Sequence, residues 1–168
     1  MKFDAIVGNP PYQENISSGD NASLSKQLFP TFIINSILLN ANYTSLITPS
    51  RWFTAEAQDK SFLRLREFLV ENNHFKKMFN YPNNKILFSD VEIAGGVNYY
   101  LYERDYVGDV EFVECSEKAT ETVKRPLFEE SSNIVIALNK SVSIMNKVIS
   151  YEDFSGLSAW ATGRNAFG

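Results

Sequence analysis

Phe3-Asp4-Ala5-Ile6-Val7-Gly8-Asn9-Pro10-Pro11-Tyr12 carries the clearest structural pattern in this chain. Its first half, from Phe3 to Val7, is short and mostly apolar and ends at Gly8, which is typical of a buried strand in a parallel sheet. Two consecutive prolines follow, and proline cannot continue a sheet ladder because it has no backbone N–H. The stretch therefore predicts a strand that stops abruptly and places a polar loop at its carboxyl end. In open α/β sheets, ligands bind at that end of the strands.

The rest of the chain predicts alternating helices and strands. Apolar residues at helical spacing predict helices over about 26–40, 58–72 and 133–150. Apolar or β-prone runs predict strands over 44–48, 75–80, 97–102 and 110–114, the last one alternating and half-exposed. Residues 13–25 are polar and are expected to form a flexible loop, either a lid that closes over a substrate or a disordered surface loop. This order of elements is an α/β pattern.

The composition fits a folded domain, since 44% of the 168 residues are hydrophobic and 14% are aromatic. No apolar run approaches the ~20 residues of a membrane span, and the start lacks the apolar stretch of a signal peptide. The single cysteine, Cys115, excludes an internal disulfide and a cysteine-based metal cluster, and the expected location is a reducing cytoplasm. A net charge of −4 argues against a free-standing DNA-binding module, but it is compatible with a part of a larger DNA enzyme.

The tetrapeptide Asn9-Pro10-Pro11-Tyr12 combines two hydrogen-bond acceptors with an aromatic face. The Asn9 side-chain oxygen and the Pro10 carbonyl can each accept one N–H of an amino group. The prolines stiffen the loop, so that both acceptors are fixed before a ligand arrives. Tyr12 offers a flat surface on which a base can stack. Asn and Pro also form ordinary turns, but the strand before them and the order of elements after them favour a functional site.

Residues 3–12 resemble the catalytic motif of class I S-adenosylmethionine-dependent amino-methyltransferases. Further similarity to bacterial restriction–modification N6-adenine DNA methyltransferases, gamma-class and type IIG-like, is found at 28–32, 46–53, 75–88, 95–103 and 161–167. The last of these stretches resembles the opening of their target-recognition domain. The tetrapeptide is the most specific part of the resemblance, followed by the Pro49-Ser50-Arg51-Trp52 turn.

The resemblance implies the later half of a Rossmann-like methyltransferase sheet, mostly parallel with an antiparallel last strand. Residues 1–115 would be a partial catalytic domain, and 116–168 a linker and the beginning of the target-recognition domain. It implies methyl transfer from S-adenosylmethionine to N6 of a flipped-out adenine in double-stranded DNA. The catalytic residues would be Asn9, Pro10, Pro11 and Tyr12, and no metal is needed.

One feature of the family is missing from the sequence. These enzymes bind the cofactor through a Gly-containing loop upstream of the motif, but here the motif starts at Asn9. Gly95-Gly96 does not fit such a loop because no helix is expected after it. We therefore expect a fragment that is inactive alone and needs an N-terminal half or a partner subunit. Half a sheet exposes an edge and an apolar face, so self-association through that edge is also expected.

Two other functions remain open. The same tetrapeptide occurs in protein-glutamine and some RNA guanine amino-methyltransferases, because a planar amide or amine poses the same geometric problem. The chain is also compatible with a non-catalytic DNA-binding or specificity remnant. Among the other aromatic residues, the candidates for holding the base are Phe79, Tyr81 and Phe88. The basic residues that are candidates for phosphate contacts, most of them expected on the solvated surface, are Arg51, Arg64, Arg66, Lys76, Lys77 and Lys85.

Overall fold

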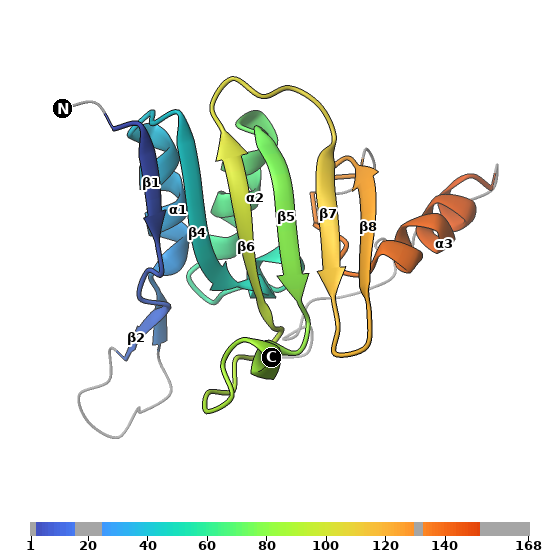
Figure 1. Cartoon of the computed structure of the whole chain (residues 1–168), viewed down its shortest axis with the longest axis horizontal. Coiled ribbons are helices and arrows are strands. Elements are labelled where there is room, and N and C mark those ends of the chain that lie inside the picture. Colours follow the sequence, from blue (N-terminus) through green and yellow to red (C-terminus); the bar gives the residue numbers. More distant parts are fainter. Residues whose placement is uncertain (1–2, 16–24, 130–132, 152–168) are drawn as a thin grey trace, which may run out of the picture.

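A six-stranded sheet forms the centre of the computed structural model, which describes residues 3–15, 25–129 and 133–151 (Figure 1). In spatial order its strands are β1 (Ala5–Gly8), β4 (Tyr43–Pro49), β6 (Val97–Glu103), β5 (Phe75–Tyr81), β7 (Val110–Cys115) and β8 (Thr120–Arg125). Strands β1 and β4 pair in parallel, as do β5 and β7. Strand β6 lies antiparallel between β4 and β5, and β8 is antiparallel to β7. The expected α/β class is confirmed, with β1, β4, β5 and β7 in one direction and β6 and β8 reversed.

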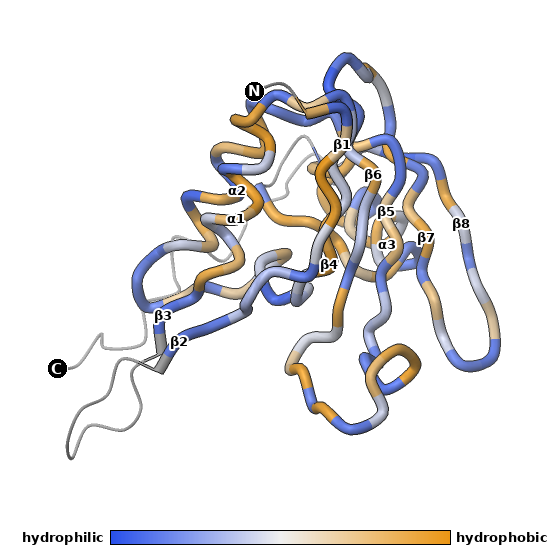
Figure 2. Tube along the Cα trace, turned by 60° about the vertical axis from the view of Figure 1, so that its left-hand side comes forward, coloured by the Kyte–Doolittle hydropathy of each residue, from blue (hydrophilic) through white to orange (hydrophobic). Residues whose placement is uncertain are grey.

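Two helices cover one face of this sheet (Figure 1). They are α1 (Phe29–Leu38) and α2 (Ser61–Glu71), which pack against each other. Both lie within the ranges predicted from apolar spacing, and Pro30 occupies the first turn of α1, where its missing N–H costs nothing. Hydrophobic residues recur along α1, α2 and β4, whereas the ribbon of β2 and β3 is hydrophilic (Figure 2). The core between helices and sheet contains Phe29, Trp52, Phe62, Leu65, Met78, Tyr100 and Phe112.

The opposite face of the sheet carries a row of aromatic rings. The rings of Phe79 and Tyr99 stack with centroids 4.6 Å apart, and Tyr81 stacks on Tyr99 at 6.0 Å. All three side chains are half-buried, and neither α1 nor α2 covers this side (Figure 1). A parallel-type sheet usually buries both faces, so this aromatic row is an apolar surface that the helices of the described residues leave open.

Several predicted elements are wrong in detail. The ends of the expected 13–25 loop form a two-stranded antiparallel ribbon, β2 (Gln13–Asn15) with β3 (Ser25–Gln27), while 16–24 lies outside the described residues. The third helix, α3 (Asn139–Ile149), begins six residues later than the expected 133. Val135 is buried and its N–H donates to the Phe53 carbonyl at 3.0 Å, which holds that segment extended against the core.

The sheet also continues past the last predicted strand. Strand β7 is mostly buried rather than half-exposed, because β5 and β8 flank it on both sides. Strand β8 was not predicted, since Thr120–Arg125 is polar and largely exposed. The domain boundary near 115 remains a prediction, and the stretch 161–167 compared with a target-recognition domain lies outside the described residues.

Candidate active site

The tetrapeptide follows β1 directly, at the edge of the sheet where the parallel strands β1 and β4 end. Asn9 is exposed and its side chain has no hydrogen-bond partner among the described residues. Pro10 is buried, which fixes the backbone between the two predicted acceptors, the Asn9 side-chain oxygen and the Pro10 carbonyl. The carbonyl of Tyr12 accepts a hydrogen bond from the backbone N–H of Leu28 at 3.0 Å, so the start of α1 fixes the end of the motif.

Two hollows flank the tetrapeptide. The larger, about 490 Å³, lies between β1 and α1, with Asn9, Pro10 and Pro11 at its rim. The smaller, about 290 Å³, contains Tyr12 together with Pro49 and Arg51 from the end of β4 and the segment 91–94 of the loop before β6. The motif therefore lies between the two hollows, with Asn9, Pro10 and Pro11 lining the larger and Tyr12 lining the smaller.

Tyr12 is half-buried against the core. The edge of its ring meets Phe29 at 6.4 Å between centroids with an interplanar angle of 81°. Its hydroxyl is buried without a hydrogen-bond partner among the described residues. Burial raises the pKa of the Tyr12 hydroxyl, because the ionised form would lose its solvation. The side chain thus acts as a neutral ring held in place by packing.

A buried polar network fixes the turn beside Tyr12. The Ser50 hydroxyl donates to Asn80 Oδ1 at 2.8 Å. The Asn98 amide donates to the Thr48 carbonyl at 3.2 Å and to Ser50 Oγ at 3.3 Å. The backbone N–H of Ser50 also donates to the Gly96 carbonyl at 2.9 Å. These bonds join the ends of β4, β5 and β6 and hold the short helix η1 (Ser50–Phe53) at the site.

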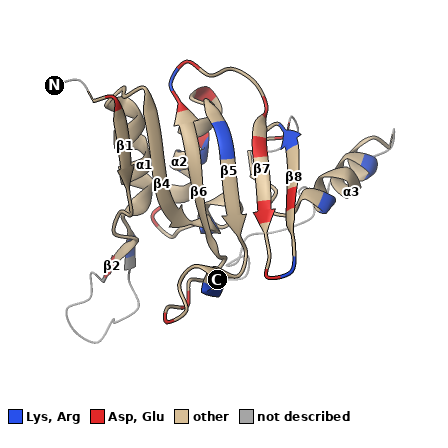
Figure 3. Cartoon of the chain, in the orientation of Figure 1, with Lys and Arg blue, Asp and Glu red and all other residues tan. Residues whose placement is uncertain are grey.

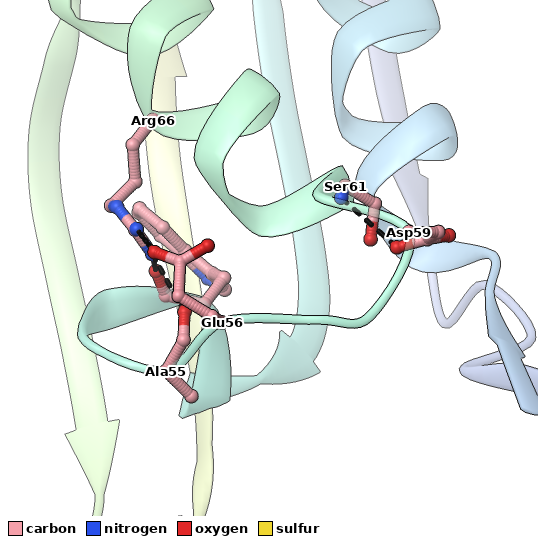
Figure 4. A network of polar contacts seen from close by, with 6 residues as sticks. Ala55, Glu56, Asp59, Ser61 and Arg66 are labelled. Carbon is pink, nitrogen blue, oxygen red and sulfur yellow. Dashed lines mark hydrogen bonds and ion pairs between the residues drawn. The ribbon is translucent and has the colours of Figure 1, made fainter. Parts of the chain in front are cut away.

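Arg66 of α2 holds η1 from the other side (Figure 4). Its guanidinium donates to the carbonyls of Trp52 and Ala55, each at 2.9 Å, and forms an ion pair with Glu56. Arg66 is buried, so its prediction as a surface or phosphate-binding residue is wrong. The backbone carbonyls left free at the end of η1 need a buried donor, and Arg66 supplies it. At the start of α2, Asp59 accepts from the Ser61 N–H at 3.0 Å (Figure 4).

The loop between β5 and β6 lines part of the smaller hollow, through residues 91–94. Its shape depends on Asn84, whose side chain donates to the Val91 carbonyl and accepts from the Ile93 N–H at 3.1 Å. Gly95 and Gly96 close the loop with φ values of +84° and +78°, a region that residues with a side chain rarely adopt. Sequence reasoning missed Val91 and Ile93, although the glycine pair marked a turn next to them.

The Eco57I restriction-modification methylase family matches residues 1–88. These residues include the tetrapeptide, the strands β1 and β4 beside it, and η1. This chain belongs to that family. Because the match covers β1 and the motif that follows it, the resemblance predicted from the sequence is confirmed.

The Eco57I-family chain is similar to a longer curated protein. An adenine-specific methylase of Mycoplasma pneumoniae, itself uncharacterized, is 35% identical over 108 residues. The alignment covers 64% of this chain and 25% of that protein, so the chain spans about a quarter of the length of its relative.

Two solved structures are also similar to the Eco57I-family chain. The methyltransferase subunit of the type I restriction-modification system from Streptococcus thermophilus is 19% identical with a TM-score of 0.49, over 92% of this chain and 33% of that one. The type IIG restriction endonuclease BpuSI is 17% identical with a TM-score of 0.49, over 73% of this chain and 19% of that one.

The other candidate residues of the Eco57I-family chain are not brought together with Tyr12. Phe79 and Tyr81 belong to the aromatic row on the open sheet face, and Phe88 is half-buried in the loop after η2 (Asn84–Ile86). None of the three lines the smaller hollow. Among the candidate cations, the ones with partners elsewhere in the described chain are Arg64, Arg66, Lys76 and Lys77. Arg51 alone of the candidate cations lines this hollow.

Charges of both signs are distributed over the described chain, with carboxylates on β7 beside lysines on β5 (Figure 3). No group of three or more His, Cys, Asp or Glu side chains among the described residues is arranged to hold a metal ion. Helices long and apolar enough to span a membrane are absent from the described part of the chain.

Proposed function

We propose that this chain is the part of a restriction–modification methyltransferase that binds a flipped-out adenine of double-stranded DNA and orients its N6 amino group for methylation. The observation that carries the proposal is the placement of Asn9 and Pro10 at the carboxyl end of β1, with an Asn9 side chain that no described residue engages. Membership of the Eco57I family supports methyl transfer as the reaction. The choice of adenine N6 and of duplex DNA is our proposal.

The chemical problem is that adenine N6 is a poor nucleophile, because its lone pair is delocalised into the ring. The Asn9 side-chain oxygen and the Pro10 carbonyl accept its two N–H groups, which favours a tetrahedral nitrogen with a localised lone pair. Tyr12 packs on the base and restricts its rotation. The amino proton leaves to water after the transfer, so the reaction requires no strong base from the chain.

S-adenosylmethionine is the methyl donor that we propose, but the described residues do not form a complete site for it. Gly95 and Gly96 lead into the strand β6 and not into a helix, so they are no glycine loop of the dinucleotide-binding type. The hollow beside Asn9 also contains no carboxylate to bind ribose hydroxyls. Residues outside the described part must therefore hold most of the donor.

We propose that a second polypeptide region binds the rest of S-adenosylmethionine. Strand β1 pairs with β4 on one side, and no described strand pairs with its other side. The side chain of Val7 on β1 is 78% exposed and Phe32 of α1 is 46% exposed, although both are apolar. An apolar edge of this kind favours pairing with another strand. We propose that the cofactor-binding half of the enzyme occupies it.

Transfer of labelled methyl from S-adenosylmethionine to mixed-sequence DNA tests this function. We expect little transfer by the chain alone, and transfer when a cofactor-binding half from the same organism is supplied. Asn9→Ala should then reduce the rate at least ~100-fold, since the site loses one of its preorganised acceptors. Methylation of N6 is verified by analysis of the hydrolysed nucleosides.

Three results would count against the proposal. Near-normal transfer by Asn9→Ala would remove the role of the acceptor. Robust transfer by the chain alone would mean that its own residues hold the donor. Labelling of RNA or of protein glutamine, with DNA left unlabelled in every combination, would identify an amino-methyltransferase with a different substrate.

A further inference from the structure

Arg51 differs from the other arginines of the described chain. Arg64 and Arg66 donate to backbone carbonyls, Arg104 pairs with Asp105, and Arg125 contacts Glu129 and the Phe112 ring. The side chain of Arg51 is exposed and has no hydrogen bond, ion pair or ring contact with any described residue. An arginine with five N–H donors and no partner in the folded chain is available to a ligand.

The backbone of Arg51 is nevertheless firmly positioned. The preceding Ser50 belongs to the buried network with Asn80 and Asn98. The carbonyl of Arg51 accepts from the Ala55 N–H at 2.9 Å, and the next residue, Trp52, is held through its carbonyl by Arg66. A cation on such a rigid support loses less conformational freedom when it binds than one on a mobile loop.

Arg51 lies in the same hollow as Tyr12. Both line the 290 Å³ hollow, together with the apolar residues Val91 and Ile93. A hollow that combines an aromatic ring with aliphatic residues suits the faces of a base. When a base turns into such a hollow, its sugar and phosphates stay at the mouth, because the strand continues on both sides. Glu92 is the other charged side chain of the hollow, and its carboxylate repels phosphate.

We propose that Arg51 binds a backbone phosphate next to the flipped adenine, on the strand that carries it. The planar guanidinium can donate two parallel N–H bonds to phosphate oxygens, which fixes the nucleotide as well as attracting it. Arg51 thereby determines how deeply the base enters the hollow beside Tyr12. This inference rests on the proposed function and adds a DNA contact outside the tetrapeptide.

The salt dependence of DNA binding tests the inference. Binding of the enzyme, assembled with its cofactor-binding half, to a fluorescein-labelled mixed-sequence duplex is followed by anisotropy at several salt concentrations. Loss of one phosphate contact lowers the slope of log K against log[salt] by about 0.9. We expect this change for Arg51→Ala, with affinity roughly tenfold lower at the lowest salt concentration. Arg51→Lys should restore most of the slope but not the full affinity, because lysine donates to phosphate as a point charge.

Arg104→Ala is the matched control, since it removes the same charge from a residue paired with Asp105 at the opposite end of the sheet. Its slope should equal that of the unaltered enzyme. An unchanged slope for Arg51→Ala, with normal binding by the unaltered enzyme, would overturn the inference and leave the proposed function standing. Failure of the unaltered, assembled enzyme to bind DNA at all would contradict both.

Discussion

Tyr12 shows how a single residue can serve both the core and the site. One part of its ring packs against Phe29, and the ring also borders the smaller hollow. Its hydroxyl is buried without a partner among the described residues, an arrangement that costs stability and adds no hydrogen bond to the site. We therefore propose that the ring, and not the hydroxyl, is the part of this side chain that contacts the base.

Substitution of Tyr12 separates these two parts. We expect Tyr12→Phe to keep methyl transfer within about twofold, and Tyr12→Ala to lose roughly 10- to 100-fold, since base stacking is worth about 1–3 kcal/mol. Burial raises the pKa of the Tyr12 hydroxyl above its ordinary value near 10. The residue thus remains neutral at pH 7 to 9.5, and the pH profiles of Tyr12→Phe and the unaltered enzyme should coincide there. A loss of activity in Tyr12→Phe comparable to that in Tyr12→Ala would assign a role to the hydroxyl.

Among single residues, the sequence predicted the tetrapeptide but not the loop residues Val91 and Ile93 that line its smaller hollow. Asn9 to Tyr12 are contiguous, and a strand followed by two prolines is a local pattern. Val91 and Ile93 reach the site because Asn84 folds their loop back, through bonds over seven and nine residues. Periodicity contains no information about such a loop, since each contact depends on the path of the chain between regular elements.

Among the elements, η1 depends most on contacts from other parts of the chain. Its four residues form one short 3-10 helix that connects β4 to the segment before α2. The amide of Asn98 and the hydroxyl of Ser50 replace water at the buried ends of three strands. Because removal of one partner leaves the others unsatisfied, this network should be sensitive to single substitutions.

Urea unfolding of Asn98→Ala provides the test. We expect the free energy of unfolding to fall by about 1–3 kcal/mol, because the Thr48 carbonyl and the Ser50 hydroxyl lose a buried donor. Asn42→Ala is the control: it removes the same side chain from an exposed position and should change stability by less than about 0.5 kcal/mol. Equal stability of the two variants would show that the network contributes nothing to the fold.

The helices and strands that the sequence predicted well are those whose apolar spacing and packing agree. In α2 the buried residues Phe62, Leu65 and Leu69 recur at helical spacing, and β4 alternates between its faces. Strand β8 was missed because its pairing with β7, and not its own composition, makes it a strand. The start of α3 was misplaced because tertiary contacts of Val135 outweigh local helical spacing.

Among the described residues the sheet has two edge strands, the apolar β1 and the polar β8, and an aromatic face that no helix covers. Exposed apolar surfaces of this kind are compatible with a chain that spans 25% of the length of its Mycoplasma pneumoniae relative. The net charge of −4 adds little repulsion between copies of the chain. In the absence of a partner, β1 is therefore the surface at which two copies would meet.

A lysine on β1 should suppress that association. We expect the chain alone to form dimers or larger species at tens of micromolar concentration, and Val7→Lys to be monomeric, because a charge on an edge strand opposes strand pairing. Light scattering after size-exclusion chromatography measures the mass. Val107→Lys is the control, since Val107 is 87% exposed in the turn between β6 and β7 and has no edge to protect. Association that persists unchanged in Val7→Lys would place the contact elsewhere.

Strand β6 has a further consequence, for the order in which the sheet can assemble during synthesis. It lies between β4 and β5, which pair with β6 and not with each other, yet it is the last of the three to be translated. At about 5–20 residues per second, the ribosome needs several seconds to proceed from the end of β4 to the end of β6. Throughout this interval β4 and β5 lack a shared neighbour, so a nascent chain stalled before Glu103 is a substrate for chaperones and proteases rather than a shorter enzyme.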